Sequence, residues 1–304
     1  MLITGASGFI GRNVCKEFEQ KGHQVLKVVR KRSLSREASS GFIPMDISPQ
    51  TDWGELLFGV DVVIHLAAVA HKKLSEDSID ELELVNVLAT ERLAKEALFA
   101  GVKKFIFISS IGVNGAQTLR SPFSEYDPPN PHNFYAESKL KAENILTELF
   151  SQSANSLYII RLPLVYGVDA PGNFASLIKL VRTLPVNPFV SIHNQRSLVS
   201  VYNVASLLVF LSVDCDRKTD RPLLFADTTA STSQVCEEIA DSLGKNLKPL
   251  PLPKFIFQFG RALPRIGPKV EQLTSNLEMQ SSKFLEDTGW SPQFGLKSTL
   301  SLEV

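Results

Sequence analysis

The chain has 304 residues, of which 44% are hydrophobic and 21% are charged, and its 32 Lys and Arg residues equal its 32 Asp and Glu residues. The hydrophobic balance is typical of a globular protein and excludes a disordered or collagen-like chain. The equal charges give no general attraction for nucleic acid or anionic lipid, although a local basic pocket remains possible. We therefore expect no nucleic-acid partner.

Signals for disulfides, metal binding and targeting are weak. Three distant cysteines, Cys15, Cys215 and Cys236, fit no disulfide framework, and the five histidines show no zinc-type spacing. The apolar run at 207–211 is too short to cross a bilayer, and the first residues lack the pattern of a secretory signal. We expect a cytoplasmic protein with reduced thiols, no membrane insertion and no metal site.

Strand and helix signals alternate through the first half of the chain. Short apolar runs predict strands, and apolar residues at three- and four-residue spacing predict helices between them. Fully apolar strands that alternate with helices indicate a parallel sheet covered on both faces. The expected fold class is therefore α/β, a Rossmann-type doubly wound parallel sheet. The predicted strands are 1–4, 24–29, 42–45, 60–66, 103–109 and 157–161, and the predicted helices are 9–20, 79–100 and 133–150.

The pattern loosens after Arg161, where prolines recur. We expect residues 1–161 to form the dinucleotide-binding domain. Residues 162–304 are expected to be mixed α/β, partly returning to the sheet and partly forming a smaller C-terminal substrate-binding lobe. The run Phe255-Ile256-Phe257-Gln258-Phe259 is interpreted as a buried helix of that lobe, with a partner or lipid surface as the alternative. Further predicted strands are 199–201 and 223–225, and further predicted helices are 203–213 and 233–243.

A glycine-rich turn follows the first strand. The stretch Gly5-Ala6-Ser7-Gly8-Phe9-Ile10-Gly11 lies between an apolar strand and a helix. Glycines at this spacing let the backbone turn tightly and approach a pyrophosphate at the helix N-terminus. The strand–turn–helix context predicts a dinucleotide-binding site here.

The end of the second strand bears on the choice of dinucleotide. Sites for NAD often carry Asp or Glu there, which binds the ribose 2′-hydroxyl. This sequence has Arg30 instead, and a guanidinium pairs well with a 2′-phosphate. The pattern favours NADP(H) and leaves NAD(H) possible, because Arg30 could also lie on a solvated loop or stack on the adenine. Asp46 is placed to accept a hydrogen bond from the adenine, or it is a simple turn residue.

A proton-transfer group is predicted from Tyr135 and Lys139. The two residues lie four apart on a predicted helix and so share one face. Lys139 can lower the pKa of the Tyr135 phenol electrostatically and hold the nicotinamide ribose. Ser110 ends a predicted strand, where doubly wound sheets place ligands. Together they form a general acid/base for proton transfer coupled to hydride transfer.

The sequence resembles the extended short-chain dehydrogenase/reductase family, in its nucleotide-sugar epimerase/dehydratase branch. The resemblance covers essentially the whole chain. Its motifs are the glycine-rich turn, His65-Leu66-Ala67-Ala68, Ser109-Ser110, Tyr135-Ala136-Glu137-Ser138-Lys139, Arg161-Leu162-Pro163-Leu164-Val165-Tyr166-Gly167 and Gly289-Trp290-Ser291-Pro292.

The resemblance assigns roles to individual residues. Ser110, Tyr135 and Lys139 match the catalytic positions, and Asn86 matches the family asparagine that is either structural or near the cofactor. It also implies a homodimer through the helices at 79–100 and 133–150. The expected substrate-binding residues are His71, Ser110, Asn173 and Arg196, with Arg196 on the sugar diphosphate. The expected cofactor-binding residues are Gly5, Ser7, Gly8, Phe9, Ile10, Gly11, Arg30, Asp46, Ile47, Leu66, Ala67, Ala68, Ser109, Tyr135, Lys139, Pro163 and Val165.

Departures from the family pattern reduce the number of candidate reactions. Ser110 is followed by Ile111 and not by the Asp-Glu pair of dehydratases, which argues against a 4,6-dehydratase. The second diphosphate-binding arginine of 4-epimerases has no clear counterpart, and Arg261 or Arg265 could replace it.

Three functions remain. The favoured one is NADPH-dependent reduction of a UDP-4-keto-6-deoxy-hexosamine in surface polysaccharide synthesis. The alternative is a UDP-glucose/galactose-type 4-epimerase that keeps NAD bound. The remote one is a non-catalytic NADP-binding sensor, which would not need the Ser110–Tyr135–Lys139 group.

Overall fold

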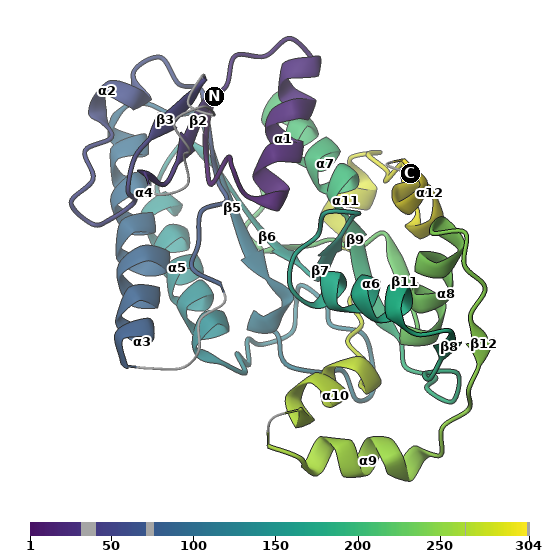
Figure 1. Cartoon of the computed structure of the whole chain (residues 1–304). Helices are drawn as coiled ribbons and strands as arrows, with labels where there is room; N and C mark the ends of the chain where they lie inside the picture. The colour runs from purple at the N-terminus through teal and green to yellow at the C-terminus, as the bar shows by residue number, and fades with distance from the viewer. Residues whose placement is uncertain (32–40, 71–75, 265, 303–304) are drawn as a thin grey trace.

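A parallel sheet with the first strand near its centre organises the molecule (Figure 1). The computed structural model describes residues 1–31, 41–70, 76–264 and 266–302. Within these residues the sheet has seven strands in the order β10-β6-β5-β4-β1-β2-β3, all paired in parallel. This order is the doubly wound arrangement, so the predicted fold class is confirmed. The strands are β1 (Leu2–Thr4), β2 (Leu26–Val29), β3 (Phe42–Pro44), β4 (Val62–His65), β5 (Lys104–Ser110), β6 (Ser156–Leu162) and β10 (Leu223–Leu224).

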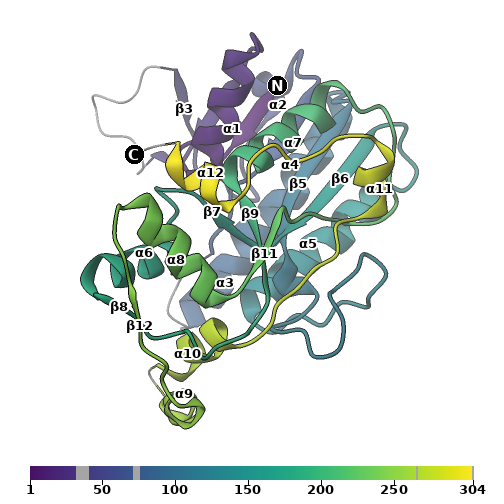
Figure 2. The same cartoon turned by 90° about the vertical axis from the view of Figure 1, so that its right-hand side faces the viewer.

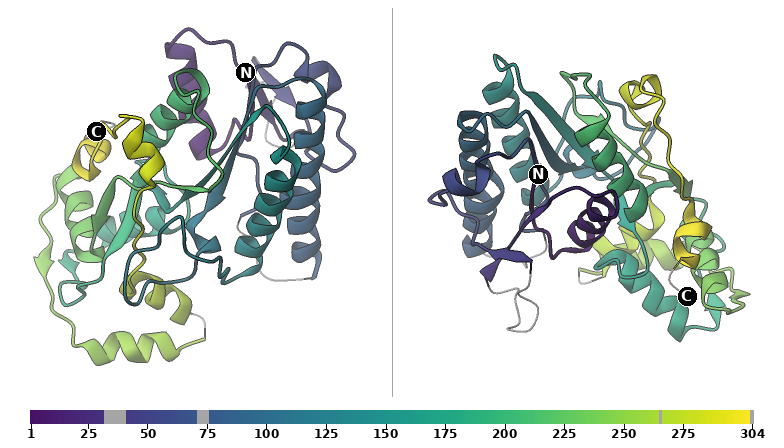
Figure 3. Two further views of the ribbon diagram at one scale, coloured as in Figure 1. Left: turned by 180° about the vertical axis from the view of Figure 1, so that it is seen from behind. Right: turned by 90° about the horizontal axis from the view of Figure 1, so that it is seen from above.

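Helices cover both faces of this sheet (Figure 3). One face packs against α1 (Phe9–Gln20), α7 (Val201–Val213) and α11 (Lys283–Asp287). The other packs against α2 (Gly54–Leu57), α4 (Ala89–Phe99) and α5 (Phe134–Phe150). All four residues of β4 are buried, as a strand covered on both sides requires.

The predicted helix at 79–100 is interrupted by a change in helical geometry. It consists of α3 (Glu76–Leu82), a π-helix over Glu83–Leu88, and α4. The π-helical segment contains the buried Asn86, whose side chain bonds to both backbone polar groups of Val69. Such segments frequently mark functional sites, and hydrophobic periodicity does not distinguish them from α-helix.

The second half of the chain forms short elements beside the main sheet. Strand β10 joins that sheet beside β6. Other strands form a three-stranded sheet, β11-β9-β7, and a pair, β12-β8. Several of these strands have only two or three residues, which is too short for a periodic signal. The elements are β7 (Leu164–Tyr166), α6 (Asn173–Thr183), β8 (Val186–Asn187), β9 (Arg196–Ser200), β11 (Thr228–Ala230), α8 (Thr232–Ser242), β12 (Lys248–Pro249), α9 (Lys254–Ala262), α10 (Gly267–Thr274) and α12 (Leu296–Ser301).

Helix α9 corrects the expectation of a buried helix at 255–263. Phe255 and Phe259 are 66% and 68% exposed, and Ile256 is 40% exposed. Phe257 faces inward, with its ring centroid 6.1 Å from that of Phe189. Figures 1 and 2 show α9 at the end of the molecule remote from the N-terminus, with α10 between it and the body. In the part of the chain that the structure describes, no helix has the length and apolar character needed to span a bilayer.

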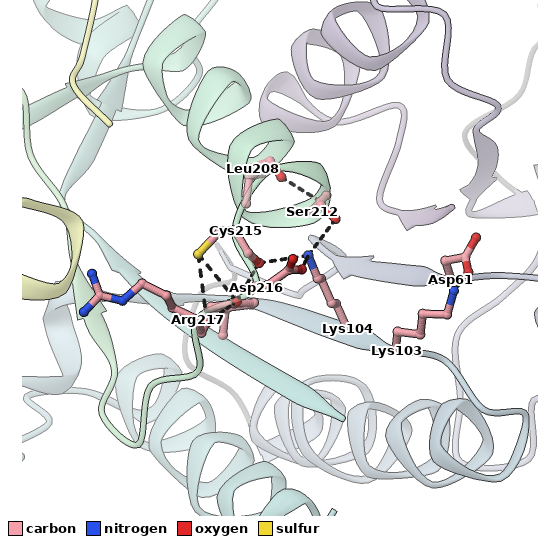
Figure 4. A network of polar contacts seen from close by, with 9 residues as sticks. Asp61, Lys103, Lys104, Leu208, Ser212, Cys215, Asp216 and Arg217 are labelled. Atoms are coloured by element: carbon pink, nitrogen blue, oxygen red, sulfur yellow. Dashed lines mark hydrogen bonds and ion pairs between the residues drawn. The ribbon is translucent and has the colours of Figure 1, made fainter. Parts of the chain in front are cut away.

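Lys104 links the two halves of the chain at the start of β5 (Figure 4). Its ammonium donates to the carbonyl oxygens of Ser212 and Cys215, at 3.1 and 2.9 Å. A cation at a helix C-terminus satisfies carbonyls that have no partner within the helix. The end of α7 is thereby held against the main sheet, whereas the neighbouring Lys103 pairs with Asp61 at the surface.

Candidate active site

The glycine-rich turn between β1 and α1 forms a backbone cradle. Gly5 has φ +70°, and a Cβ on it would lie 2.9 Å from the backbone nitrogen of Ala67. A Cβ on Gly11 would collide with the carbonyl oxygen of Gly5. Gly8 is the N-cap of α1, with no capping side chain and no acidic residue in the first turn. This open helix N-terminus fits the pyrophosphate of a dinucleotide.

A cavity of about 380 Å³ lies beside this cradle. Its lining joins two parts of the predicted cofactor site that are distant in sequence. One part is the glycine-rich cradle, and the other is the carboxyl ends of β2 and β3. The Asp46 carboxylate also accepts a hydrogen bond from the backbone of Lys31, at 3.3 Å, and so ties these two strand ends. The predicted residues that line the cavity are Gly5, Ser7, Gly8, Arg30, Asp46, Ile47, Leu66, Ala67 and Ala68.

A buried histidine fixes the wall formed by residues 66–68. The hydroxyl of Thr4 accepts from the backbone of Ala67 and lies 2.7 Å from His65 Nδ1. His65 Nε2 lies 2.9 Å from the hydroxyl of Thr90, which donates to the carbonyl of Asn86. Burial lowers the pKa of His65 to about 3, so the ring is neutral. A neutral ring that donates from Nε2 satisfies every partner in this chain of hydrogen bonds.

Asn86 connects the 66–69 segment of the cavity wall to the helix that carries Tyr135. Its side chain accepts from the backbone of Val69 at 2.8 Å and donates to the Val69 carbonyl and to the Ser138 hydroxyl, both at 3.0 Å. Ser138 in turn donates to the carbonyl of Tyr135 at 2.8 Å. Asn86 is therefore a positioning residue between the 66–69 segment and Tyr135.

The end of β5 packs closely against the start of α5. Ser110 is the last residue of β5, and its hydroxyl accepts from the backbone of Gly112 at 3.1 Å. A Cβ on Gly112 would lie 3.3 Å from that hydroxyl and 3.4 Å from the Cβ of Ala136. Ala136 is the residue next to Tyr135, so the structure brings the strand end of Ser110 to the helix turn of Tyr135.

Lys139 is buried beneath this turn. Only 2% of the residue is exposed, and its ammonium donates to the carbonyl of Ile108 at 2.8 Å. The ammonium also lies 4.4 Å from the ring centroid of Phe107 and 6.0 Å from that of Tyr135. Burial lowers the pKa of Lys139 to about 7, while the Glu143 carboxylate acts in the opposite direction.

The expected lowering of the Tyr135 pKa is wrong for the protein alone. Burial raises the pKa of Tyr135 to about 12. Lys139 does not offset this, because its ammonium donates to the carbonyl of Ile108 and lies 6.0 Å from the centroid of the Tyr135 ring. The Tyr135 phenol is therefore protonated at neutral pH in this structure.

A buried ion pair that the sequence interpretation missed lies behind Lys139. Arg161 binds the Glu143 carboxylate through Nε and Nη2, at 3.0 and 2.5 Å, and donates to the side chain of Asn114 at 3.0 Å. The hydroxyl of Ser109 also donates to Glu143. The sequence held one signal for this, since Glu143 continues the four-residue spacing of Tyr135 and Lys139.

The remaining predicted cofactor residues lie outside the lining of the 380 Å³ cavity. Phe9 packs toward Gly167, where a Cβ would lie 3.0 Å from its ring. Ile10 packs against the core beneath α1, and Gly11 is buried against the cradle. Pro163 is buried between β6 and β7, and Val165 lies in β7.

A second cavity, of about 230 Å³, contains two of the expected substrate residues. Asn173 is the first residue of α6, and Arg196 begins β9. Burial lowers the pKa of Arg196 to about 10, so it stays charged at neutral pH, and it donates to the carbonyl of Ser275 at 3.0 Å. Lys269 of α10 also lines this cavity and was missed from the sequence. Two cations beside a helix N-terminus suit a diphosphate.

Among the residues that the structure describes, the other expected substrate-binding residues do not line this cavity. His71 and Arg265 lie outside the described residues. Arg261 is directed to the hydroxyl of Thr274, with Nε at 3.0 Å, and is not among the residues that line the 230 Å³ cavity. Lys269 lines this cavity, and Arg261 does not.

Comparisons with known proteins agree with this geometry. A family model described as the NAD dependent epimerase/dehydratase family matches residues 1–222. A UDP-glucose 4-epimerase from Vibrio cholerae is 36% identical, over 98% of this chain and 94% of that protein. The solved structure of UDP-glucuronic acid 4-epimerase from Bacillus cereus in complex with NAD superimposes with a TM-score of 0.76 and 22% identity, over 99% of this chain and 96% of that one. The structure of UDP-glucose 4-epimerase from Thermotoga maritima with UDP-glucose superimposes with a TM-score of 0.73 and 23% identity, over 99% of this chain and 96% of that one.

Replacing Glu143 by Gln tests the buried pair. Because the variant leaves the Arg161 guanidinium buried without a countercharge, we expect the free energy of unfolding in urea to fall by about 3 kcal/mol. The matched control is Glu83→Gln, which removes the exposed ion pair with Lys141 and should cost less than about 1 kcal/mol. Equal losses in the two variants would contradict the role given to Glu143.

Proposed function

Because the chain belongs to the NAD dependent epimerase/dehydratase family, we propose that it is a 4-epimerase of a nucleotide-activated hexose that keeps its dinucleotide bound. The family and the whole-length relative make it an enzyme of the nucleotide-sugar epimerase/dehydratase type. The observation that carries the finer proposal is the 36% identity to a UDP-glucose 4-epimerase over 98% of the chain.

The site geometry supports chemistry at a carbinol carbon. A bound dinucleotide would supply a hydride acceptor and donor at the nicotinamide. Tyr135 would take the proton of the C4 hydroxyl as hydride leaves C4, and would return a proton when hydride adds to the opposite face of the 4-keto sugar. Ser110 would hold the C4 oxygen by a hydrogen bond. Lys139 would hold the nicotinamide ribose and, when charged, stabilise the phenolate.

Proton removal requires the deprotonated form of Tyr135. Burial raises the pKa of this phenol to about 12. The positive charge of an oxidised nicotinamide close to the phenol would lower that pKa, as would full protonation of Lys139. The same high pKa suits Tyr135 as the acid in the return step.

The 230 Å³ cavity supports binding of a sugar diphosphate. Arg196 offers a fixed guanidinium, Lys269 a second cation and Asn173 the first turn of α6. A diphosphate held there would leave the sugar to be oriented by contacts nearer Ser110. The freedom to present either face of C4 is what a 4-epimerase needs.

A second candidate is the NADPH-dependent reductase of a UDP-4-keto-6-deoxy-hexosamine. One observation favours it: Arg30 lines the cofactor cavity at the end of β2, where a 2′-phosphate would lie. In this reaction Tyr135 acts only as the acid, in keeping with its high pKa. The two candidates differ in whether the dinucleotide stays bound or is exchanged at each turnover.

A homodimer is also proposed. The helices at 76–99 and 134–150 leave apolar side chains exposed in the single chain. Covering them with the same helices of a second copy would form a four-helix contact of the closed kind common among homodimers. These side chains are Ile79, Leu84, Leu88 and Phe134.

Replacement of Tyr135 by Phe tests the proton-transfer role. We expect turnover of a UDP-hexose to fall by about 10²- to 10⁴-fold, because the acid/base is lost. Binding of the dinucleotide should remain nearly unchanged in a fluorescence titration. The control is Tyr126→Phe, an exposed tyrosine, which should keep full turnover. Persistence of turnover in Tyr135→Phe would remove this residue from the mechanism.

The variant Arg30→Ala tests the 2′-phosphate contact. If Arg30 pairs with a 2′-phosphate, titrations should show that the variant binds NADPH at least about tenfold more weakly, while its affinity for NADH is little changed. Lys31→Ala is the control, since the neighbouring Lys31 does not line the cavity. The same titrations would contradict a 2′-phosphate contact if both dinucleotides weakened equally.

A further inference from the structure

Helix α9 carries an apolar face that the rest of the described chain leaves uncovered. The face consists of Phe255, Ile256 and Phe259, with Leu263 directly after the helix, and all four are exposed. At ~100° per residue, Phe255 and Phe259 lie about 40° apart on the helix, with Ile256 and Leu263 beside them. Three large apolar side chains on one short helix, with a fourth directly after it, exceed the scattered single residues expected on a surface.

The opposite side of α9 anchors it to the body. Gly260 is buried, and a Cβ there would lie 3.3 Å from Val270 of α10. Phe257 packs near Phe189. The apolar face is therefore held outward by contacts on the other side of the same helix, and Figures 1 and 2 show α9 as the outermost element at this end.

The chain around α9 has one sign of charge. Between Asp241 and Glu271 the sequence contains no Asp or Glu, but it contains Lys245, Lys248, Lys254, Arg261, Arg265 and Lys269. Lys245 is used to bind the carbonyls of Val181 and Arg182. Lys248, Lys254, Arg261 and Lys269 are exposed. This local excess stands out in a chain whose net charge is zero.

We propose that the apolar face of α9 docks on an anionic lipid bilayer. An amphipathic helix with large apolar residues on one face and cations beside it lies in the membrane interface, with its apolar side among the acyl chains. Exposed Lys and Arg add attraction to anionic headgroups. A symmetric contact with a second copy is disfavoured, because it would bring two copies of this cation-rich segment together.

This docking surface lies one helix away from the substrate cavity. Helix α10 contacts α9 through Val270 and lines the 230 Å³ cavity with Lys269, Gln272 and Leu273. Binding at the bilayer would therefore bring the proposed diphosphate site close to the membrane surface. The inference does not rest on the proposed function, since lipid binding requires neither dinucleotide nor turnover.

Flotation of the full-length protein with vesicles tests the proposal. Vesicles of phosphatidylcholine mixed with phosphatidylglycerol should bind the protein, and raised salt should weaken the binding. The double variant Phe255→Glu/Phe259→Glu should lower the partition coefficient at least about tenfold. Lys254→Gln, at the first residue of α9, should lower it about fivefold on these vesicles.

The matched control is Phe58→Glu/Phe99→Glu, which makes the same change at phenylalanines that are 90% and 96% exposed elsewhere. It should bind vesicles like the unmodified protein. No binding by the unmodified protein, or equal loss in both double variants, would overturn the proposal. Sedimentation velocity without lipid gives the other decisive result. A Phe255→Glu/Phe259→Glu variant that alone dissociates into monomers would show that α9 contacts a second copy instead.

Discussion

The burial of the Lys139 ammonium is the constraint on which the candidate active site depends. A buried cation must find partners in place of water, and here they come from two elements of the fold. The carbonyl of Ile108 and the ring of Phe107 come from β5, and Glu143 comes from the next turn of α5. The helix that carries Tyr135 is thereby fixed against the strand that carries Ser110. Arg161 of β6 completes the arrangement by pairing with Glu143.

A second set of buried hydrogen bonds links residues 66–69 to the helix turn of Tyr135. Neutral His65 and the side chain of Asn86 satisfy polar groups of β1, of the 66–69 segment and of α5. The π-helical segment that interrupts the helix at 76–99 contains Asn86 and so belongs to this link. Displacement of the 66–69 segment would therefore change the position of Tyr135.

Much of this arrangement could be predicted because its signals are local. The strand–glycine–helix turn at Gly5 and Gly8 and the four-residue spacing of Tyr135 and Lys139 are short patterns with direct physical meaning. Parallel strands place their carboxyl ends together, which puts Ser110 and the cradle on one edge of the sheet. The direction of the Tyr135 pKa shift was wrong because burial depends on packing that spacing does not report.

The features missed from the sequence depend on contacts between distant segments. Glu143 and Arg161 meet only because β6 lies beside β5, and Lys269 reaches the 230 Å³ cavity only because α10 returns to α6 and β9. The outward direction of Phe255 and Phe259 has the same origin. The sequence of an apolar helix is the same whether other elements cover it or leave it exposed. Packing of the rest of the chain determines which of the two occurs.

The most direct test of the proposed epimerase is the nucleotide released when the purified protein is denatured, identified by chromatography. Together with titrations of the native protein by NADH and NADPH, it asks whether the dinucleotide is a resident cofactor or a consumed substrate. A closed redox cycle predicts a stoichiometric amount of NAD retained through purification. An empty site that prefers NADPH would contradict the epimerase and favour the reductase.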